Sequence, residues 1–436
     1  MEFTKGRELQ KRLHEIVPAG GHTYSKGDDQ FPELAPGLMV RGKGAYSWDA
    51  DGNKFLDYGM GLRSVGIGYA DDEINEAVVK ELANGTNLTR PSVLELKLAE
   101  RYVSLIPSME MVKFGKNGSD VTSAAVKLSR AYTGRKYIAV CQDHPFFSVN
   151  DWFIGSTPCN NGIPDEIRNL TLRFKYNDIE SVKELFAKYP GQIAGIILEP
   201  LKNDEPKDNF LQELRAVTEK EGTVLIFDEM ISGFRWNLKG AQEIVGIRPD
   251  LTTFGKATAN GFSVSVLGGR KEIMELGGLF HDKPRVFLLS QTHGAESTGL
   301  AAALKNIDIY ERDKVSEHHW AYGRRFMEGI NSLAKSNGVA DYFEIRGYEC
   351  SPIIVAKDAE KKPNLYYHTL FQQEIIKKGV LMPWIAFCRE HGEEELKITL
   401  EACDFAFATY KKAIDEGYEK YLTGGPVKPV WRVYNK

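Results

Sequence analysis

Short hydrophobic runs alternate with longer amphipathic segments through the middle of the chain. The runs at 136–141, 193–199 and 223–229 are rich in β-branched residues and almost uninterrupted by polar ones. Such runs are typical of strands that are covered on both faces of a parallel sheet. Between them, the segments 92–106 and 209–222 have the mixed polar and apolar spacing of helices. The alternation therefore predicts an α/β fold for this part of the chain.

The start of the chain has a different pattern. Its first residues predict a helix with Phe3, Leu9, Leu13 and Ile16 on one side, and a turn-rich segment follows. The stretch "GAYSWDADGNKFLDYG" then predicts two short strands joined by a turn at its Asp-Gly pair.

The end of the chain is rich in helix. A long helical segment covers 309–338, and a closing helix is expected near 393–416. We predict a large domain over 70–310 and a smaller domain built from 1–69 together with 311–436.

Composition narrows the function. The chain has 436 residues, with 42% hydrophobic and 27% charged residues, which is ordinary for a globular protein. A formal net charge of −4 leaves no basic stripe, so we expect no nucleic-acid partner. The N-terminus lacks the apolar core of a signal peptide, and no stretch is apolar for long enough to cross a membrane.

Cysteine usage agrees with a reducing compartment. The five cysteines are scattered and form no C-x-x-C pair. This pattern predicts free thiols, a cytoplasmic location and no metal site.

One lysine raises a chemical question. In "LTTFGKATANGFS", residues 251–263, Lys256 follows a short apolar run, and Ala257, Ala259 and Gly261 are expected to leave space around it. A surface lysine in a turn is the ordinary interpretation. The alternative is an amine held in a tight pocket, where it can form a Schiff base.

A possible anion site opens a predicted helix. Asn117, Gly118, Ser119 and Asp120 begin this helix, and Gly134 ends it. Glycine lets the backbone approach an anion, and the unpaired N–H groups and the helix dipole favour it. A well-capped helix without any ligand remains the alternative.

A buried carboxylate is expected at the end of the strand in "TVLIFDEMISGFRW". Asp228 follows strand-forming residues, at the edge where open α/β sheets bind ligands. Its cationic partner is either Arg235 or a protonated pyridine nitrogen of a bound ligand. Met230 would lie on the same strand face if the strand continues.

Together, an anion site, a carboxylate for a ring nitrogen and a Schiff-base lysine are what pyridoxal 5'-phosphate requires. At these residues the chain resembles class III aminotransferases of the fold-type I pyridoxal-phosphate superfamily, and most closely the glutamate-1-semialdehyde aminomutase branch. "NGSD", "ILEP", "IFDEMISGFR" and "PDLTTFGKATANGFSVSVLGGR" carry the resemblance. It implies a mostly parallel seven-stranded sheet in the large domain and a smaller α+β domain from both termini.

The resemblance also implies roles for individual residues. Lys256 and Asp228 would be catalytic. Thr292, in "QTHGAES", would reach the cofactor phosphate of a neighbouring subunit, which implies a homodimer. The residues expected to bind the cofactor are Asn117, Gly118, Ser119, Phe146, Glu199, Asp228, Met230, Lys256 and Thr292.

The chain departs from the aminomutase branch in two places. Gly27 stands where the branch has an arginine for the substrate carboxylate, and the segment "DWFIGSTPCNNGIP" is shorter than the branch's gating loop. Both differences favour transfer between two molecules. The candidate substrate contacts are His22, Tyr24, Lys26, Arg63 and Arg389.

The predicted function is therefore a pyridoxal-phosphate aminotransferase that acts through a Lys256 Schiff base in two half-reactions. It would move an amino group from an amino-acid donor to an aldehyde or ketone, in surface-polysaccharide or other specialised amine synthesis. A 1,2-aminomutase is the main alternative, and a non-catalytic protein that binds the cofactor is a minor one.

Overall fold

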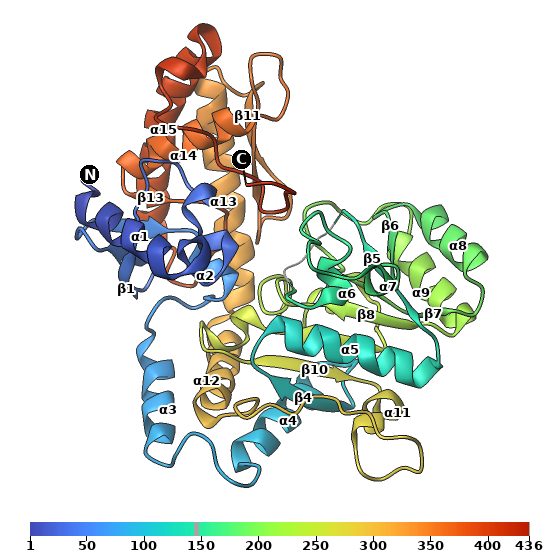
Figure 1. The fold of residues 1–436 in the computed structure, drawn as a ribbon. Helices are drawn as coiled ribbons and strands as arrows, with labels where there is room; N and C mark the ends of the chain where they lie inside the picture. Colours follow the sequence, from blue (N-terminus) through green and yellow to red (C-terminus); the bar gives the residue numbers. More distant parts are fainter. Residues whose placement is uncertain (144–147, 436) are drawn as a thin grey trace. The chain divides into compact units, whose positions relative to one another are not determined.

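The computed structural model describes residues 1–143 and 148–435, which form two compact units (Figure 1). Unit 1 consists of Met1–Asp71 and Glu317–Val430, and unit 2 consists of Asp72–Ser316 and the residues from Trp431. The predicted boundaries instead assign residues 311–316 and the residues from Trp431 to the smaller part. As limits of folding domains, they stay a prediction.

Unit 2 is built on a seven-stranded sheet with the order β4-β10-β9-β8-β7-β5-β6. Strand β10 is antiparallel to both of its neighbours, and the pairs from β9 to β6 are all parallel. The predicted mostly parallel sheet is confirmed. Its strands are β4 (Met111–Gly115), β5 (Tyr137–Cys141), β6 (Thr171–Phe174), β7 (Ile193–Leu198), β8 (Val224–Asp228), β9 (Leu251–Phe254) and β10 (Ser265–Gly269).

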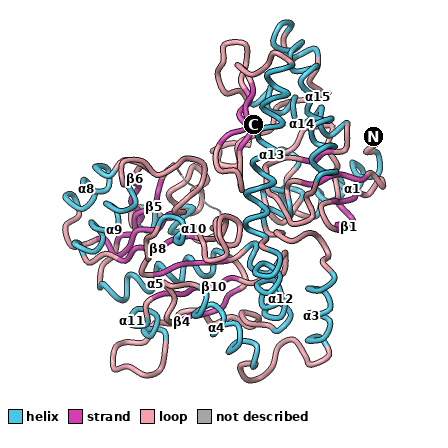
Figure 2. Tube along the Cα trace, turned by 180° about the vertical axis from the view of Figure 1, so that it is seen from behind, coloured by secondary structure: helices cyan, strands magenta, loops and turns pink. Residues whose placement is uncertain are grey.

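Helices connect these strands, as Figure 2 shows from behind. The helices and 3-10 turns of unit 2 are α3 (Asp72–Leu82), α4 (Val93–Leu105), α5 (Gly118–Thr133), α6 (Asp151–Ile154), α7 (Asp165–Arg168), α8 (Ile179–Lys188), α9 (Phe210–Glu221), α10 (Ala241–Val245), η4 (Lys256–Ala259), α11 (Lys271–Met274), η5 (Glu275–Gly277) and α12 (Ser297–Asp313).

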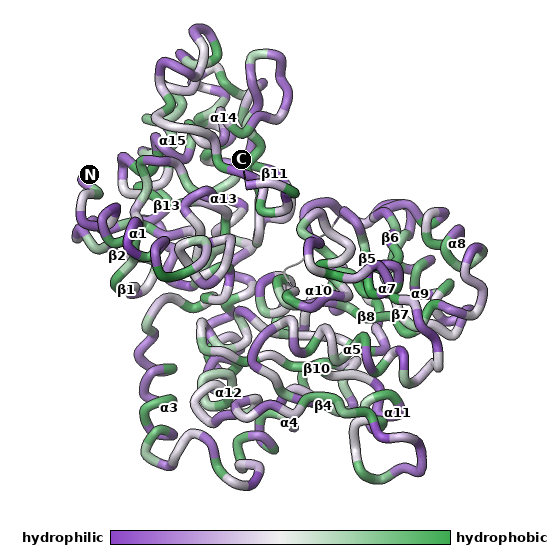
Figure 3. Tube along the Cα trace, viewed as in Figure 1, coloured by the Kyte–Doolittle hydropathy of each residue, from purple (hydrophilic) through white to green (hydrophobic). Residues whose placement is uncertain are grey.

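Both faces of the central strands β7 and β8 are buried, and these strands are largely hydrophobic (Figure 3). In β8, Val224 and Ile226 pack with residues of α5, whereas Leu225 and Phe227 pack with residues of α8 and α9. Because side chains alternate along a strand, Asp228 follows Val224 and Ile226 onto the α5 face.

Strand β8 does not continue to Met230, so the condition for placing Met230 on the same strand face as Asp228 is not met. The strand ends at Asp228, and a turn follows in which the Met230 N–H donates to Asp228 Oδ1 at 3.0 Å. The carboxylate competes here for a backbone donor that a longer strand would use in its ladder.

Unit 1 contains a four-stranded sheet with the order β1-β2-β3-β13 and a separate β11-β12 hairpin. The antiparallel pairing of β2 with β3 confirms the hairpin that the sequence predicts. Its elements are α1 (Thr4–Ile16), η1 (Pro18–Gly20), η2 (Tyr24–Lys26), η3 (Asp28–Gln30), β1 (Met39–Lys43), β2 (Tyr46–Asp49), β3 (Lys54–Asp57), α2 (Met60–Arg63), β11 (Phe343–Arg346), β12 (Ile353–Ala356), α14 (Leu365–Lys377), β13 (Val380–Leu381), α15 (Glu393–Glu416) and η6 (Tyr418–Lys420).

The helical segment predicted over 309–338 is interrupted. Lys314 adopts a left-handed backbone with φ 51° and ends α12, after which α13 (Val315–Ser336) begins. The closing helix predicted near 393–416 is confirmed as α15.

The residues that the sequence places on one side of α1 differ in burial. Ile16 is 70% exposed and Leu9 is also exposed, whereas Phe3 is buried against Phe55. The helix is held at its beginning, because the N–H groups of its first turn bind the Asp51 carboxylate.

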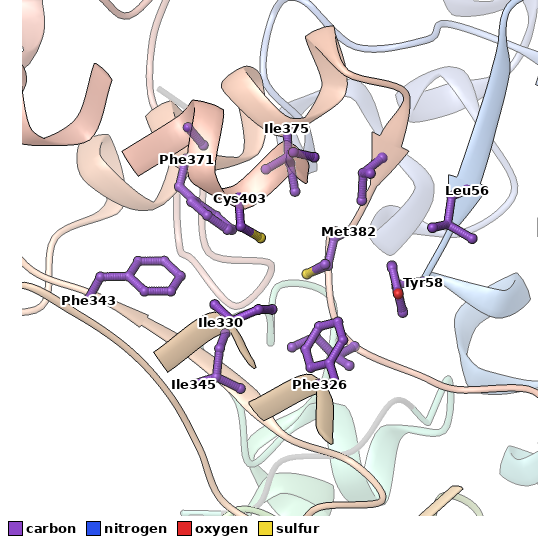
Figure 4. Packing of buried hydrophobic residues seen from close by; sticks show 14 of the residues in the cluster. Leu56, Tyr58, Phe326, Ile330, Phe343, Ile345, Phe371, Ile375, Met382 and Cys403 are labelled. Atoms are coloured by element: carbon purple, nitrogen blue, oxygen red, sulfur yellow. The ribbon is translucent and has the colours of Figure 1, made fainter. Parts of the chain in front are cut away.

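The core of unit 1 gathers side chains from distant parts of the sequence. Figure 4 shows Leu56 and Tyr58 from the N-terminal segment beside Phe326, Ile330 and Met382 from the C-terminal one. Both segments are therefore needed to complete this core. Among the helices described, none is long and apolar enough to span a membrane.

Candidate active site

The candidate site lies at the carboxyl ends of three adjacent parallel strands. Glu199 follows β7, Asp228 ends β8, and Gly255 and Lys256 follow β9. The register pairs Leu198 with Phe227 across β7 and β8. Carboxyl ends of neighbouring parallel strands meet at one edge of a sheet, where α/β proteins bind ligands.

Asp228 is a buried carboxylate on which the charges of Glu199 and Lys256 act. It is 1% exposed, and besides the Met230 N–H it accepts from Thr253 Oγ1 at 3.3 Å. Burial, and then the Glu199 carboxylate, raise the pKa of Asp228 to about 6, while the Lys256 ammonium lowers it. Of the groups described, Lys256 is thus a cation that acts on this carboxylate, whereas Arg235 and a pyridinium nitrogen were the two partners that the sequence left open.

Glu199 shares this edge of the sheet. It is 2% exposed and forms an ion pair with Lys202, whose side chain is mostly buried. Sequence reasoning missed Lys202, although its place three residues after Glu199 was a usable signal. The Lys202 ammonium therefore balances the charge of the Glu199 carboxylate, which acts on Asp228.

Glu229, the next acid, has a structural role. Its carboxylate accepts from the Ala241 and Gln242 N–H groups at 2.8 and 2.9 Å and so caps α10. Burial raises the pKa of Glu229 to about 7. The two neighbouring acids therefore have different roles: Asp228 lies at the edge of the sheet where a ligand can bind, and Glu229 caps a helix.

The backbone that follows Lys256 is held by hydrogen bonds from helix α12. Asn306 Nδ2 on α12 donates to the carbonyl groups of Ala257 and Thr258, both at 2.9 Å. Lys256 itself has φ 46°, an uncommon conformation for a residue with a side chain, and such strain persists where surrounding contacts enforce it.

The small residues after the lysine do not have the predicted effect. Ala257 and Ala259 are fully buried, so they let η4 pack closely into the core instead of leaving space around Lys256. Small side chains here serve packing density.

The predicted anion site has the expected helix geometry. Helix α5 begins at Gly118 and ends at Gly134, which has φ 68°. Asp120 turns back to accept from the N–H groups of Asn117 at 2.9 Å and Lys116 at 3.3 Å. The Asp120 N–H already donates to the Asn117 carbonyl at 3.1 Å. The N–H groups of Gly118 and Ser119 have no acceptor within the helix, so they suit an anion.

Ser119 is held by a neighbouring segment. Its Oγ accepts from the Val149 N–H at 3.1 Å, and its carbonyl accepts from Asn150 Nδ2 at 3.1 Å. A hydroxyl that accepts from an N–H group still has its own proton to donate. Ser119 can therefore donate to a phosphate while it remains anchored.

Met230 connects the anion site to the lysine. A β-carbon built on Gly118 would lie 3.1 Å from Met230 Sδ, and one on Gly255 would lie 2.5 Å from the same atom. The close approach of this sulfur atom leaves little space for a side chain at either position, and least at Gly255. The Met230 side chain is consequently in contact with the α5 N-terminus and with the residue before Lys256.

These residues fit pyridoxal phosphate. The amide groups at the start of α5 suit a phosphate, the buried Asp228 calls for a cation such as a pyridinium nitrogen, and Lys256 supplies the amine. Between residues 1–143 and 148–435, no cluster of three His, Cys, Asp or Glu side chains is placed to bind a metal.

Two further predicted cofactor residues lie elsewhere or are not described. Phe146 lies outside the described residues. Thr292 is exposed and lines a cavity of about 470 Å³ in unit 2, together with residues 86–92. No residue of the Lys256, Asp228 and Glu199 group lines this cavity.

The predicted substrate residues all belong to unit 1. His22 and Lys26 line a cavity of about 1030 Å³ beside Trp384. Tyr24 is 72% exposed and does not line it.

The two predicted arginines are placed differently. Arg63 is the last residue of α2 and is half-buried. Arg389 pairs with Asp71 at 3.1 Å and with Glu390 at 2.9 Å, so its guanidinium is already bound to carboxylates. Neither arginine lines the cavity that contains His22 and Lys26.

The chain is similar to characterised proteins over almost its whole length. The 3-aminobutyryl-CoA aminotransferase of Cloacimonas acidaminovorans is 32% identical, over 95% of this chain and 99% of that protein. The glutamate-1-semialdehyde 2,1-aminomutase 2 of Halalkalibacterium halodurans is 31% identical, over 94% and 99%.

Solved structures give the same result. The FumI protein of Sphingopyxis sp., in its PLP internal aldimine form, has a TM-score of 0.87 at 26% identity, covering 95% of this chain and 98% of that one. An omega-transaminase from Sphaerobacter thermophilus has a TM-score of 0.82 at 25% identity, covering 93% and 98%. The family model for class III aminotransferases matches residues 30–383, and the chain belongs to this family of pyridoxal-phosphate enzymes.

Proposed function

We propose that this aminotransferase moves an amino group from an amino-acid donor to an aldehyde or ketone whose reacting carbon is not adjacent to a carboxylate. The observation that supports this chemistry is the position of Glu199, Asp228 and Lys256 at the carboxyl ends of three adjacent strands. There the charges of Glu199 and Lys256 both act on the Asp228 carboxylate. Two relatives, one named a 3-aminobutyryl-CoA aminotransferase and the other an omega-transaminase, support an acceptor whose reacting carbon is not adjacent to a carboxylate.

The residues of unit 2 divide the work. Bound pyridoxal phosphate supplies an aldehyde that takes up the amino group and a ring that withdraws electrons from the reacting carbon. Lys256 Nζ would hold the aldehyde between turnovers and would carry the proton from one carbon to the next. A positioned base of this kind contributes roughly a hundred- to ten-thousandfold.

Asp228 keeps the ring nitrogen protonated. Its carboxylate is fixed by Thr253 and the Met230 N–H, so it can face a pyridinium without rearrangement. An ionised Asp228 is costly while it is buried alone and favourable once a cation faces it. Cofactor binding and ionisation of Asp228 are therefore coupled.

The phosphate is assigned to the start of α5. Asn117, Gly118 and Ser119 would surround it, and the Met230 side chain would contact one face of the ring. Phe146 is proposed to contact the other face of the cofactor ring. Glu199 is proposed to influence the ionisation of Asp228 through its charge.

A 1,2-aminomutase is the second candidate, because the Halalkalibacterium relative has that name. Gly27 argues against it. A β-carbon at Gly27 would lie 2.9 Å from Asp29 Oδ1 and 3.1 Å from the Tyr24 carbonyl oxygen, so the branch's arginine does not fit here without a shift. A lysine nearby does not reproduce a bidentate guanidinium.

A homodimer is also proposed. Exposed apolar side chains line the cavity that also contains Thr292, among them Leu88 and Leu96. Such a patch is unusual for a monomer, and a second copy of the chain would cover it. Thr292 would then reach the partner's cofactor phosphate.

A cytoplasmic location is proposed from the thiols. All five cysteines are free, and four of them are buried. A protein of an oxidising compartment would more commonly pair such residues.

Half-reaction screening tests the proposal. The purified protein is mixed with single amines, and the colour of the bound cofactor is followed without an acceptor. Bleaching by an α-amino acid donor and by β- or ω-amino compounds is expected. A protein that reacts only with α-amino acids would contradict the acceptor class, and turnover without any second substrate would establish the mutase.

A further inference from the structure

The C-terminal residues from Trp431 lie beyond the segment that matches the family model, yet they pack in unit 2. The Trp431 ring meets the Phe153 ring edge to face, with centroids 6.2 Å apart and planes at 71°. Cys159 Sγ donates to the Arg432 carbonyl at 3.3 Å. Two independent contacts therefore fix this tail against the segment that contains α6.

Helix α6 depends on such contacts. It has four residues, Asp151–Ile154, and one turn of helix is not stable by itself. Trp152 Nε1 donates to Ser123 Oγ on α5 at 2.8 Å, and Phe153 is almost fully buried between α5 and the tail. Trp431 packs against the same hydrophobic cluster that contains Phe153 and the buried residues of α5.

The residues just before α6 hold Ser119. The Val149 N–H and Asn150 Nδ2 both bind Ser119, as described above, and Asn150 is the N-cap of α6. A displacement of α6 would move both donors away from the first turn of α5.

We propose that Trp431 is a positioning residue for the cofactor phosphate: by packing on Phe153, it holds Val149 and Asn150 against Ser119 and so keeps the start of α5 in its binding geometry. This rests on the proposed role of Ser119. The tail would thus act on one part of the cofactor and leave the lysine and the ring site unchanged.

The test compares two ligands on the full-length apoprotein. Pyridoxal phosphate and pyridoxal are titrated by absorbance, and they differ only in the phosphate. For Trp431→Ala, the dissociation constant of pyridoxal phosphate is expected to rise about tenfold, while that of pyridoxal changes by less than about twofold. A general loss of structure would weaken both ligands.

Three variants sharpen the test. Trp431→Phe keeps an aromatic ring and should restore most of the affinity. Tyr434→Ala, at a tail residue that is 79% exposed, should change neither ligand. Asn150→Ala leaves Trp431 in place and should give a smaller loss, about threefold, again for pyridoxal phosphate alone.

An equal loss for both ligands, or unchanged affinity in Trp431→Ala, would overturn the inference. If that variant does not fold, unchanged binding in Asn150→Ala has the same meaning. Ser119→Ala separates this failure from that of the proposed site. If Ser119→Ala loses affinity selectively and Trp431→Ala does not, only the tail's role is wrong; if neither does, the phosphate assignment is wrong.

Discussion

Unit 2 fixes its proposed cofactor residues from several sides, whereas unit 1 leaves its candidate substrate residues largely in solvent. Asp228 and Glu199 are almost fully buried, and Met230 is packed against two glycines. In contrast, Lys26 and Tyr24 are exposed. The chemistry of the enzyme therefore depends on buried residues that few others can replace, and its specificity depends on residues that the fold constrains little.

The sharpest test of this contrast is Lys256→Ala. Turnover should fall by about ten-thousandfold or more, because the variant loses both the nucleophile and the proton carrier. Steady-state rates with an active donor measure the effect. Lys239→Ala, on the surface of the same unit, is the matched control and should keep its rate. Substantial activity in Lys256→Ala would refute the assignment.

Asp228→Ala comes next. The cofactor should still attach to Lys256, but turnover should fall by about a thousandfold because the ring nitrogen loses its carboxylate. Absorbance of the attached cofactor and single-turnover rates measure the two parts separately. Near-normal rates would mean that the ring nitrogen has another partner.

The third prediction concerns pH. Burial raises the pKa of Asp228 to about 6, so in the apoprotein its contribution to stability is present at low pH and is lost as the pH rises through 6. Relative to Asp228→Asn, the apoprotein should lose about 3 kcal/mol of unfolding free energy between about pH 4 and 6.

Thermal unfolding at a series of pH values measures this loss. Bound cofactor should reduce it, because a cation then faces the ionised carboxylate. Glu229, whose pKa burial raises to about 7, remains in both proteins, so most of its own contribution cancels; the Asp228 charge, which Asp228→Asn removes, raises this pKa further. Parallel curves for the wild type and Asp228→Asn would contradict the prediction.

Unit 1 should give the smallest effects. Lys26→Ala is expected to raise KM for an anionic donor by about fivefold, since an exposed charge contributes at most about 1 kcal/mol. Arg389→Ala should change KM by less than about twofold, because its guanidinium already binds Asp71 and Glu390. Initial rates over a range of donor concentrations measure both, and a larger effect at Arg389 would reverse the assignment.

The sequence predicted the sheet and the limits of α5 well because buried strands and helix ends have strong local signals. The strand before Asp228 and the glycine that ends α5 are examples. Lys202 and Thr253 were missed, because their importance comes from contacts with Glu199 and Asp228 that only the folded sheet creates.

Other errors have a similar cause. Periodicity placed Leu9 and Ile16 on the same side of α1 as Phe3, but it did not predict that both are exposed and that the helix is anchored by its first turn. Arg389 was a plausible substrate residue until its carboxylate partners were visible. Local pattern predicts which elements form, but it does not predict which charged groups find partners across them.

The most direct test of the central claim is reduction of the cofactor-loaded protein with borohydride, followed by peptide mass analysis. The account predicts one pyridoxyl group per chain, on Lys256. A label on Lys202 or another lysine, or no label at all, would contradict it.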